Sequence, residues 1–345
     1  MMRHTQLPAI STAGLAVVCC LFMMQSAFAG SIVGWGGNDY GEATPPDGND
    51  FVAIAAGVGN SLALKSDGSI VAWGDNRAGQ ATPPDGNDFV AIDAGGLSAQ
   101  PMIPSGYSLA LKSDGSIISW GNINRPRGFE GNDFIAIAAG EGYCLALKSE
   151  GSIVGWGNNG RGQITPPDGN DFVAIAAGHS HSLALKTDGS IVGWGWNLDG
   201  QAAPPDGKDF VAIAAGTGHS LALKSDGSIV AWGDNRRGQA TPPDGNDFVA
   251  IAAGQFHSLA LKSDGSIVGW GENRKGEATP PDGNDFVAIA AGYNHSLAIR
   301  RNCEYELVGD LNDDCKVDFS DFEILAANRL IDCNLNPSDP ACVPK

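Results

Sequence analysis

The sequence predicts an all-β fold, a seven-bladed β-propeller followed by a small separate tail, and two observations lead to it. One unit recurs seven times along the chain, and most copies are 38 residues apart. Each copy also contains three short apolar segments bounded by glycine, proline, aspartate and asparagine, which is typical of strands joined by tight turns. The tryptophans that mark the copies are Trp35, Trp73, Trp120, Trp156, Trp194, Trp232 and Trp270.

Each copy is expected to form one blade of three strands, although the pattern leaves a fourth strand open. In the first complete copy the strands are predicted at residues 51–57, 61–65 and 69–74. An Asp-Gly pair at 67–68 is typical of a tight hairpin. The Pro-Pro-Asp-Gly-Asn-Asp segment at 45–50 cannot continue a ladder, because proline lacks the amide donor, so it is assigned to the crossover between blades.

The two ends of the repeat region complete one another. Residues 31–36 form a lone third strand at the start, and the last copy ends with a second strand at 296–300 that no tryptophan strand follows. Pairing these strands would close the ring and leave no terminal blade exposed. We therefore predict a closed propeller over residues 30–301 rather than an open stack.

The first 29 residues have the features of a signal peptide. A basic start precedes an apolar run that is too short to cross a bilayer and stop there, and Ala27-Phe28-Ala29 has the form of a cleavage site. We expect export through the Sec route, to the periplasm, the cell surface or the medium. The mature chain is expected to have no transmembrane segment.

Charge and cysteine content narrow the classes of protein further. The chain has 21 basic and 39 acidic residues, a formal net charge of −18, which argues against nucleic-acid binding. In an exported protein, the four cysteines after residue 301 indicate two disulfides, with three pairings open. Cys144 stands where the sister copies have serine, so it is interpreted as a small buried residue.

The repeated residues carry a family resemblance. Gly-Ser-Ile-Val-Gly-Trp-Gly, Ala-Ile-Ala-Ala-Gly and His-Ser-Leu-Ala-Leu-Lys at 181–186 resemble the regulator of chromosome condensation repeat, which implies a propeller. The Trp-Gly-x-Asn-x-x-Gly-Gln motif at 73–80 is similar to that of the secreted propeller-type beta-lactamase inhibitor proteins of bacteria. The second resemblance implies inhibition of an extracellular enzyme. The action of the chromatin protein on a nuclear GTPase is not expected of an exported acidic chain.

Variation between the copies falls in two loops, one between the first and second strands and one after the tryptophan. Both should emerge on one face, because strand direction alternates within a blade. Aromatic residues and arginine dominate binding hot spots, so we predict a protein-binding face there. Stacking on a glycan and unselected surface variation remain as alternatives. The candidate residues are Tyr40, Arg77, Tyr107, Arg127, Tyr143, Arg161, Trp196, Arg236, Phe256 and Tyr293.

Histidine recurs at one position of four copies. A ring of imidazoles can bind metal, but other copies have asparagine or tyrosine there, so we favour a structural role in which each histidine hydrogen-bonds backbone. No nucleophile elbow, phosphate loop or paired His/Glu motif occurs in the sequence, so no enzymatic activity is expected. The recurrent histidines are His181, His219, His257 and His295.

The tail, residues 302–345, is acidic and contains a candidate Ca²⁺ loop at 310–321. Oxygen ligands stand at the spacing that calcium loops use, and an apolar segment at helical spacing follows at 322–331. The candidate ligands are Asp310, Asn312, Asp314, Lys316 through its carbonyl, Asp318 and Asp321.

The calcium loop resembles a dockerin repeat. That resemblance implies a cohesin partner and a place in an assembly that degrades polysaccharides, although the usual second loop is missing and Cys315 replaces the usual glycine. The sequence as a whole predicts an exported, non-enzymatic binding protein that is attached through its tail. The alternatives are glycan recognition and inhibition of an extracellular enzyme.

Overall fold

The computed structural model describes residues 29–96, 106–122 and 130–301. Within these ranges the chain is all-β and contains no helix, and its strands fall into repeated groups of three, as predicted. The strands are β1 (Gly30–Gly36), β2 (Phe51–Ala56), β3 (Asn60–Lys65), β4 (Ile70–Gly74), β5 (Phe89–Gly95), β6 (Tyr107–Lys112), β7 (Ile117–Gly121), β8 (Phe134–Ala139), β9 (Tyr143–Lys148), β10 (Ile153–Gly157), β11 (Phe172–Ala177), β12 (His181–Lys186), β13 (Ile191–Gly195), β14 (Phe210–Ala215), β15 (His219–Lys224), β16 (Ile229–Gly233), β17 (Phe248–Ala253), β18 (His257–Lys262), β19 (Ile267–Gly271), β20 (Phe286–Ala291) and β21 (His295–Arg301).

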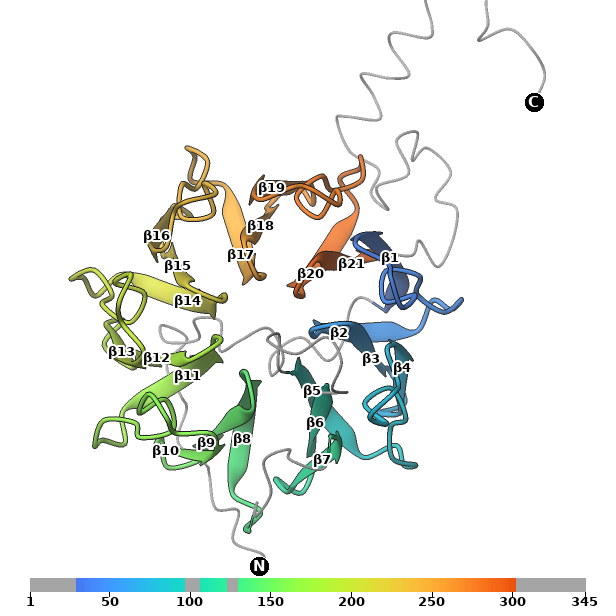
Figure 1. Ribbon diagram of the computed structural model, residues 1–345, viewed down its shortest axis with the longest axis horizontal. Coiled ribbons are helices and arrows are strands. Elements are labelled where there is room, and N and C mark those ends of the chain that lie inside the picture. The colour runs from blue at the N-terminus through green and yellow to red at the C-terminus, as the bar shows by residue number, and fades with distance from the viewer. Residues whose placement is uncertain (1–28, 97–105, 123–129, 302–345) are drawn as a thin grey trace, which may run out of the picture.

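Each group of three strands is an antiparallel unit in chain order, such as β14-β15-β16. Five units form separate sheets, and a six-stranded sheet, β20-β21-β1-β2-β3-β4, contains two more that meet only at the pair Gly30 and Phe51. Figure 1 shows the units arranged around a ring, with the first strand of each nearest the centre.

The first and last strands of the ring pair with each other, as the sequence predicts. β1 lies antiparallel to β21 over its whole length, from Gly30 opposite Arg301 to Gly36 opposite His295. β1 therefore supplies the third strand of the unit that β20 and β21 begin. The N-terminal part of the repeat region closes the ring.

The hydrophobic core lies between neighbouring units rather than inside any one of them. Phe210, at the start of β14, is buried with Leu183 and Leu185 of β12, in the preceding unit. At the closure, Leu297 and Ile32 pack with Phe51 in the same way. Each unit thus buries its apolar face only against its neighbours, which is the physical reason that the chain needs a ring.

A repeated hydrogen-bond latch joins each unit to the next. The carbonyl of Gln201, in the loop after β13, accepts hydrogen bonds from the Ser220 hydroxyl and the Trp232 indole of the next unit, both at 2.9 Å. At the closure the Glu277 carbonyl accepts from Ser296 at 2.9 Å and from Trp35 at 3.0 Å. The recurrent tryptophan and the glutamine of the repeat motif are therefore two halves of one contact between units.

Several predicted features lie outside the described residues. They are the signal peptide apart from Ala29, the candidate site residue Arg127, the tail with its four cysteines, and the six candidate calcium ligands Asp310, Asn312, Asp314, Lys316, Asp318 and Asp321. Among the residues that the structure does describe, none belongs to a helix able to cross a bilayer.

Candidate binding face

The two variable loops of each unit lie at the same end of the ring, as predicted. In the unit β14-β15-β16, His219 at the start of β15 pairs with Gly233 at the end of β16. The amide of Asp234, in the loop after β16, donates to the carbonyl of Gly218, in the loop before β15, at 2.8 Å. We call the surface formed by these two sets of loops the loop face.

The prediction that Tyr107 and Tyr143 lie on the binding face is wrong. Both are the first residues of second strands, and both are buried. The Tyr107 hydroxyl donates to the Gly140 carbonyl at 2.9 Å, and the Tyr143 hydroxyl donates to the His181 carbonyl at 2.5 Å, in each case in the following unit. Burial raises the pKa of both phenols, so they are neutral links between units.

The recurrent histidines occupy the same position as these tyrosines and are equally buried. His181 lies 2.9 Å from the hydroxyl of Ser220 in the next unit, and that hydroxyl donates to the Gln201 carbonyl. The hydroxyl must therefore accept from Nε2–H of the histidine, so the proton of the neutral ring is assigned to Nε2. The structural role is as expected, but the partner of the histidine is a serine side chain rather than backbone.

Burial sets the protonation state of these histidines. It lowers the pKa of His181, His219 and His295 to about 3 and that of His257 to about 4, with neighbouring histidines adding to the shift in the first three. Nδ1 of three of them has no hydrogen-bond partner among the described residues. A proton added to such a ring would be an unpaired buried charge, so the ring stays neutral down to acid pH.

Three arginines on the loop face stack on aromatic rings of a neighbouring unit. Arg77 lies 4.7 Å from the ring centre of Tyr40, and Arg161 lies 4.9 Å from that of Trp196. The sequence analysis did not select the third arginine, Arg237, which lies 4.1 Å from the ring centre of Phe256. Such contacts attract the cation to the ring face and hold both side chains in one orientation.

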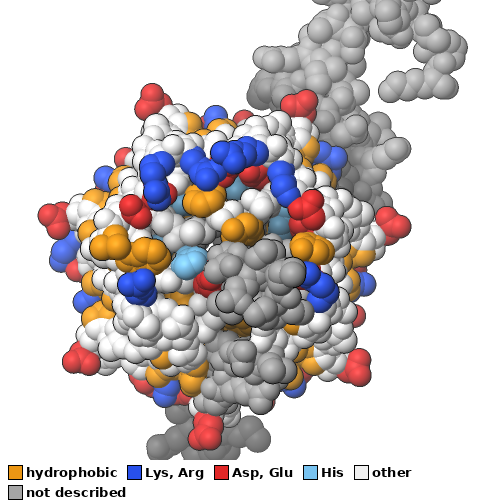
Figure 2. Space-filling view, in the orientation of Figure 1, with side chains coloured by type: hydrophobic (Ala, Val, Ile, Leu, Met, Phe, Trp, Pro, Cys, Tyr) orange, Lys and Arg blue, Asp and Glu red, His pale blue; other side chains and the backbone are white. Residues whose placement is uncertain are grey.

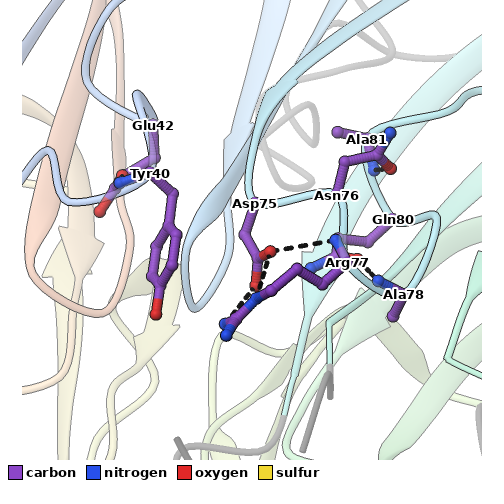
Figure 3. Close-up of polar contacts among 8 residues, drawn as sticks. All are labelled: Tyr40, Glu42, Asp75, Asn76, Arg77, Ala78, Gln80 and Ala81. Carbon is purple, nitrogen blue, oxygen red and sulfur yellow. Dashed lines mark hydrogen bonds and ion pairs between the residues drawn. The ribbon is translucent and has the colours of Figure 1, made fainter. Parts of the chain in front are cut away.

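Covered carboxylates hold two arginines of the loop face from behind, Arg77 and Arg236. Figure 3 shows the Arg77 guanidinium beside Asp75, with Tyr40 nearby. Nε of Arg77 donates to Oδ1 of Asp75 at 2.8 Å, and Nη2 donates to Oδ2 at 2.9 Å. The side chain of Asp75 is 9% exposed and that of Arg77 is 46% exposed. Arg236 repeats the geometry on Asp234, and its hydrogen bonds lower the pKa of that carboxyl. In each pair the acid is covered and the guanidinium faces outward.

The remaining candidate residues are partly exposed on the same face. Tyr40 is 46% exposed, and Trp196, Phe256 and Tyr293 are half-buried. The sequence analysis missed Leu198, which is 80% exposed in the loop of Trp196. An exposed leucine beside a half-buried tryptophan is the kind of apolar feature that partner surfaces bury.

The first strands line a central channel with a volume of about 340 Å³. Its wall is mostly alanine, isoleucine and glycine, and within the strands it departs from that pattern at Asp93 of β5, where the sister copies have alanine. The Asp93 carboxylate accepts from the Ala139 amide of the next unit at 2.8 Å. Burial raises its pKa to about 6 against these amide hydrogen bonds. Asp93 therefore acts as another link between units.

The repeated units resemble a known family of repeats. Five segments of the chain match the family model of the regulator of chromosome condensation (RCC1) repeat. They are residues 51–80, 134–163, 172–201, 210–239 and 248–277. Each segment runs from the first strand to the glutamine or glutamate of the latch, so the matched segments contain the residues that join one unit to the next.

Solved structures with a similar fold come from yeast and plants. Prp20p of Saccharomyces cerevisiae, whose structure was described with its binding to Gsp1p and histones, is 19% identical with a TM-score of 0.68, over 90% of this chain and 98% of that one. The ectodomain of the Physcomitrella patens receptor kinase CR4 is 22% identical with a TM-score of 0.57, over 69% and 68% of the two chains. No curated protein matches the sequence significantly. At these identities the likeness concerns the fold.

Proposed function

We propose that this chain is a non-enzymatic binding protein, a seven-bladed propeller of RCC1-type repeats that takes a protein partner on its loop face. The observation that carries the proposal is the set of outward-facing arginines, each stacked on an aromatic ring or held by a covered carboxylate. Arginine, tryptophan and tyrosine are the residues that most often dominate binding energy.

Preorganisation supports this reading. A partner that binds flexible arginines must first immobilise them, which costs roughly 0.5–1.5 kcal/mol for each side chain. Here Arg77 and Arg236 are already held by two hydrogen bonds each to Asp75 and Asp234. The protein has therefore met most of that cost on folding, and a partner gains the contact without it.

The relatives favour the same class of function. Yeast Prp20p has been described with its binding to Gsp1p and histones, and bound to Kap60. Those partners belong to the yeast protein. What this chain shares with it is a ring of blades whose loops are free to carry a binding surface.

Site-specific photocrosslinking tests the proposal. A photoreactive amino acid in place of Leu198 stands on the loop face, whereas one in place of Lys208 stands near the Asp188 hairpin at the other end of the blades. In the protein mixture that the source organism releases, the 198 probe should form a discrete crosslinked protein band that the 208 probe does not. Equal patterns at the two positions would contradict a binding loop face.

Export and attachment complete the proposed role. We propose that residues 1–29 direct export and that the acidic tail binds Ca²⁺ through the loop at 310–321, by which the protein docks to a larger assembly. Both rest on sequence pattern alone. Inhibition of an extracellular enzyme is one form that the protein-binding role can take, and the crosslinked band identifies whether the partner is an enzyme.

A further inference from the structure

The loop face of this acidic protein has a basic outer surface, in contrast to the rest of the chain. Among the residues that the structure describes, six supply the cationic side chains there, and we call them the arginine arc: Arg77, Arg161, Arg236, Arg237, Arg274 and Lys275. Figure 2 shows Lys and Arg side chains gathered in an arc on one face, interleaved with hydrophobic ones, while acidic side chains project around the perimeter. The chain as a whole has a net charge of −18, so this arc is a local reversal of sign.

Contacts between units link most neighbouring loops of the arc. Arg237, after β16, pairs with Glu272, after β19, and Lys275 of that second loop pairs with Asp39, after β1. At one end Arg77 stacks on Tyr40, and at the other end Arg161 stacks on Trp196. Loops after β10, β13, β16, β19, β1 and β4 thus contribute to one surface.

Most acids beside the arc are covered while its cations are exposed; the exceptions are Asp39, which is 68% exposed and pairs with Lys275, and the exposed Asp199. The side chain of Glu272 is 11% exposed, whereas that of Arg274, which it holds at 2.7 Å, is 79% exposed. Arg161 is exposed and stacks on Trp196, and it forms no salt bridge with any residue that the structure describes. The guanidinium hydrogens that point to solvent remain available as donors for an incoming anion.

We propose that the partner of the loop face is an acidic protein segment, in which aspartate or glutamate alternates with apolar residues. Guanidinium groups pair with carboxylates in a fork geometry, and the arc presents several of them in one row. Leu198 and the half-buried Trp196 and Phe256 lie among them and supply the apolar part of the contact. The inference rests on the proposed protein-binding function and specifies its chemistry.

The same contacts disfavour two other ligands, a glycan and a nucleic acid. A sugar that stacks on Tyr40, Trp196 or Phe256 would compete with the arginine that already covers one face of each ring. A long nucleic acid would extend beyond the arc to the perimeter, where acidic side chains project, and the net charge of −18 repels further phosphates.

A peptide made of Glu-Glu-Leu repeats, labelled with fluorescein, tests the proposal by fluorescence anisotropy with the full chain. We expect saturable binding at low salt that weakens as salt rises, and no comparable binding of the Gln-Gln-Leu peptide. The double variant Arg161→Gln, Arg274→Gln should bind the acidic peptide about tenfold more weakly. This variant leaves no buried acid alone, because Glu272 keeps Arg237.

The matched control, Lys208→Gln with Lys224→Gln, also removes two positive charges, but from the other end of the blades, where the two lysines pair with Asp188 and Asp209. It should change affinity less than about twofold. Equal losses in both double variants, equal binding of the two peptides, or preferential binding of a heparin-derived oligosaccharide would each overturn the acidic-segment proposal. If the 198 crosslink persists in any of these cases, the loop face still binds protein and only its chemistry is wrong.

Discussion

Replacing His219 with asparagine should make the protein less sensitive to acid. His219 is fully buried, and burial lowers its pKa from the usual 6.5 to about 3, with a smaller contribution from His181 and His257, while Asp234 acts in the opposite direction. Asparagine is a natural replacement, because Asn60 occupies the same position in another unit and donates to the next unit's serine at 3.2 Å.

The sign and size follow from proton linkage. Above pH 6.5 the imidazole is neutral in both states and the folded protein has its full stability, whereas below pH 6.5 the unfolded chain binds a proton that the folded chain refuses. Each such histidine then removes about 1.4 kcal/mol of unfolding free energy per pH unit, so about 2 kcal/mol is lost by about pH 5. The loss continues until the pH reaches the folded-state value of about 3. Four histidines together give a limiting slope of about 5.6 kcal/mol per pH unit.

Urea unfolding followed by tryptophan fluorescence measures the effect at about pH 7.5, 6 and 5. At the highest pH the His219→Asn variant should be less stable by about 1–3 kcal/mol, because the smaller side chain leaves a void beside Gly216. At about pH 5 that deficit should shrink by about 2 kcal/mol, since the variant no longer has this proton to refuse.

The reverse substitution provides the control. Asn60→His places a fifth histidine at the equivalent position and should steepen the acid limb by about 1.4 kcal/mol per pH unit. If wild type, His219→Asn and Asn60→His lose stability in parallel between about pH 7 and 5, the buried histidines do not govern acid unfolding and the linkage argument fails.

Three further predictions concern other parts of the chain. Gly216→Ala should lower stability by more than about 2 kcal/mol in thermal unfolding, because its new Cβ would lie 2.4 Å from Cε1 of His219; a smaller loss would mean that the imidazole moves aside. Cys144 should react with iodoacetamide only after unfolding, because burial raises the pKa of its thiol, and labelling of the folded protein in mass spectra would contradict this. Calorimetry on the full chain should show Ca²⁺ uptake that Asp310→Ala abolishes, and an unaltered titration would exclude the predicted loop.

The repeated part of the fold was predictable from the sequence, because the same pattern of apolar segments and turn residues recurs in every copy. Strand bounds agree within a residue: 61–65 was expected where β3 covers Asn60–Lys65, and 69–74 where β4 covers Ile70–Gly74. Ring closure followed from matching the two incomplete ends, and the pairing of β1 with β21 confirms it.

Variation between copies misled the analysis at Tyr107 and Tyr143. A residue that differs between copies was interpreted as exposed, yet this position is the buried start of the second strand. Tyrosine, histidine and asparagine can all replace one another there, since each reaches the next unit with a polar group. The shared position with His181 and Asn60 was the signal that placed the tyrosines inside.

The direction in which each arginine side chain points could not be predicted from the sequence. In the pair Arg236-Arg237, only Arg237 stacks on Phe256. The reason lies in the turn: the Arg236 amide binds the Asp234 carboxylate, whereas the Arg237 amide binds the side chain of Gln239. Adjacent residues are thereby aimed differently, and no pattern of residue types shows which one meets the ring.

The latch and the arginine arc lie in the same loops but use different groups: the latch uses backbone carbonyls and the arc uses side chains. Stability and binding can therefore change separately. In the loop after β4, the Gln80 carbonyl accepts from Ser108 and Trp120 of the next unit, while Arg77 of that loop faces solvent. The backbone of the loop is therefore held by the core, while its outward side chains face the proposed partner. Substitution of Arg161 or Arg274 should alter partner affinity without lowering the unfolding free energy, whereas substitution of a latch serine should do the opposite.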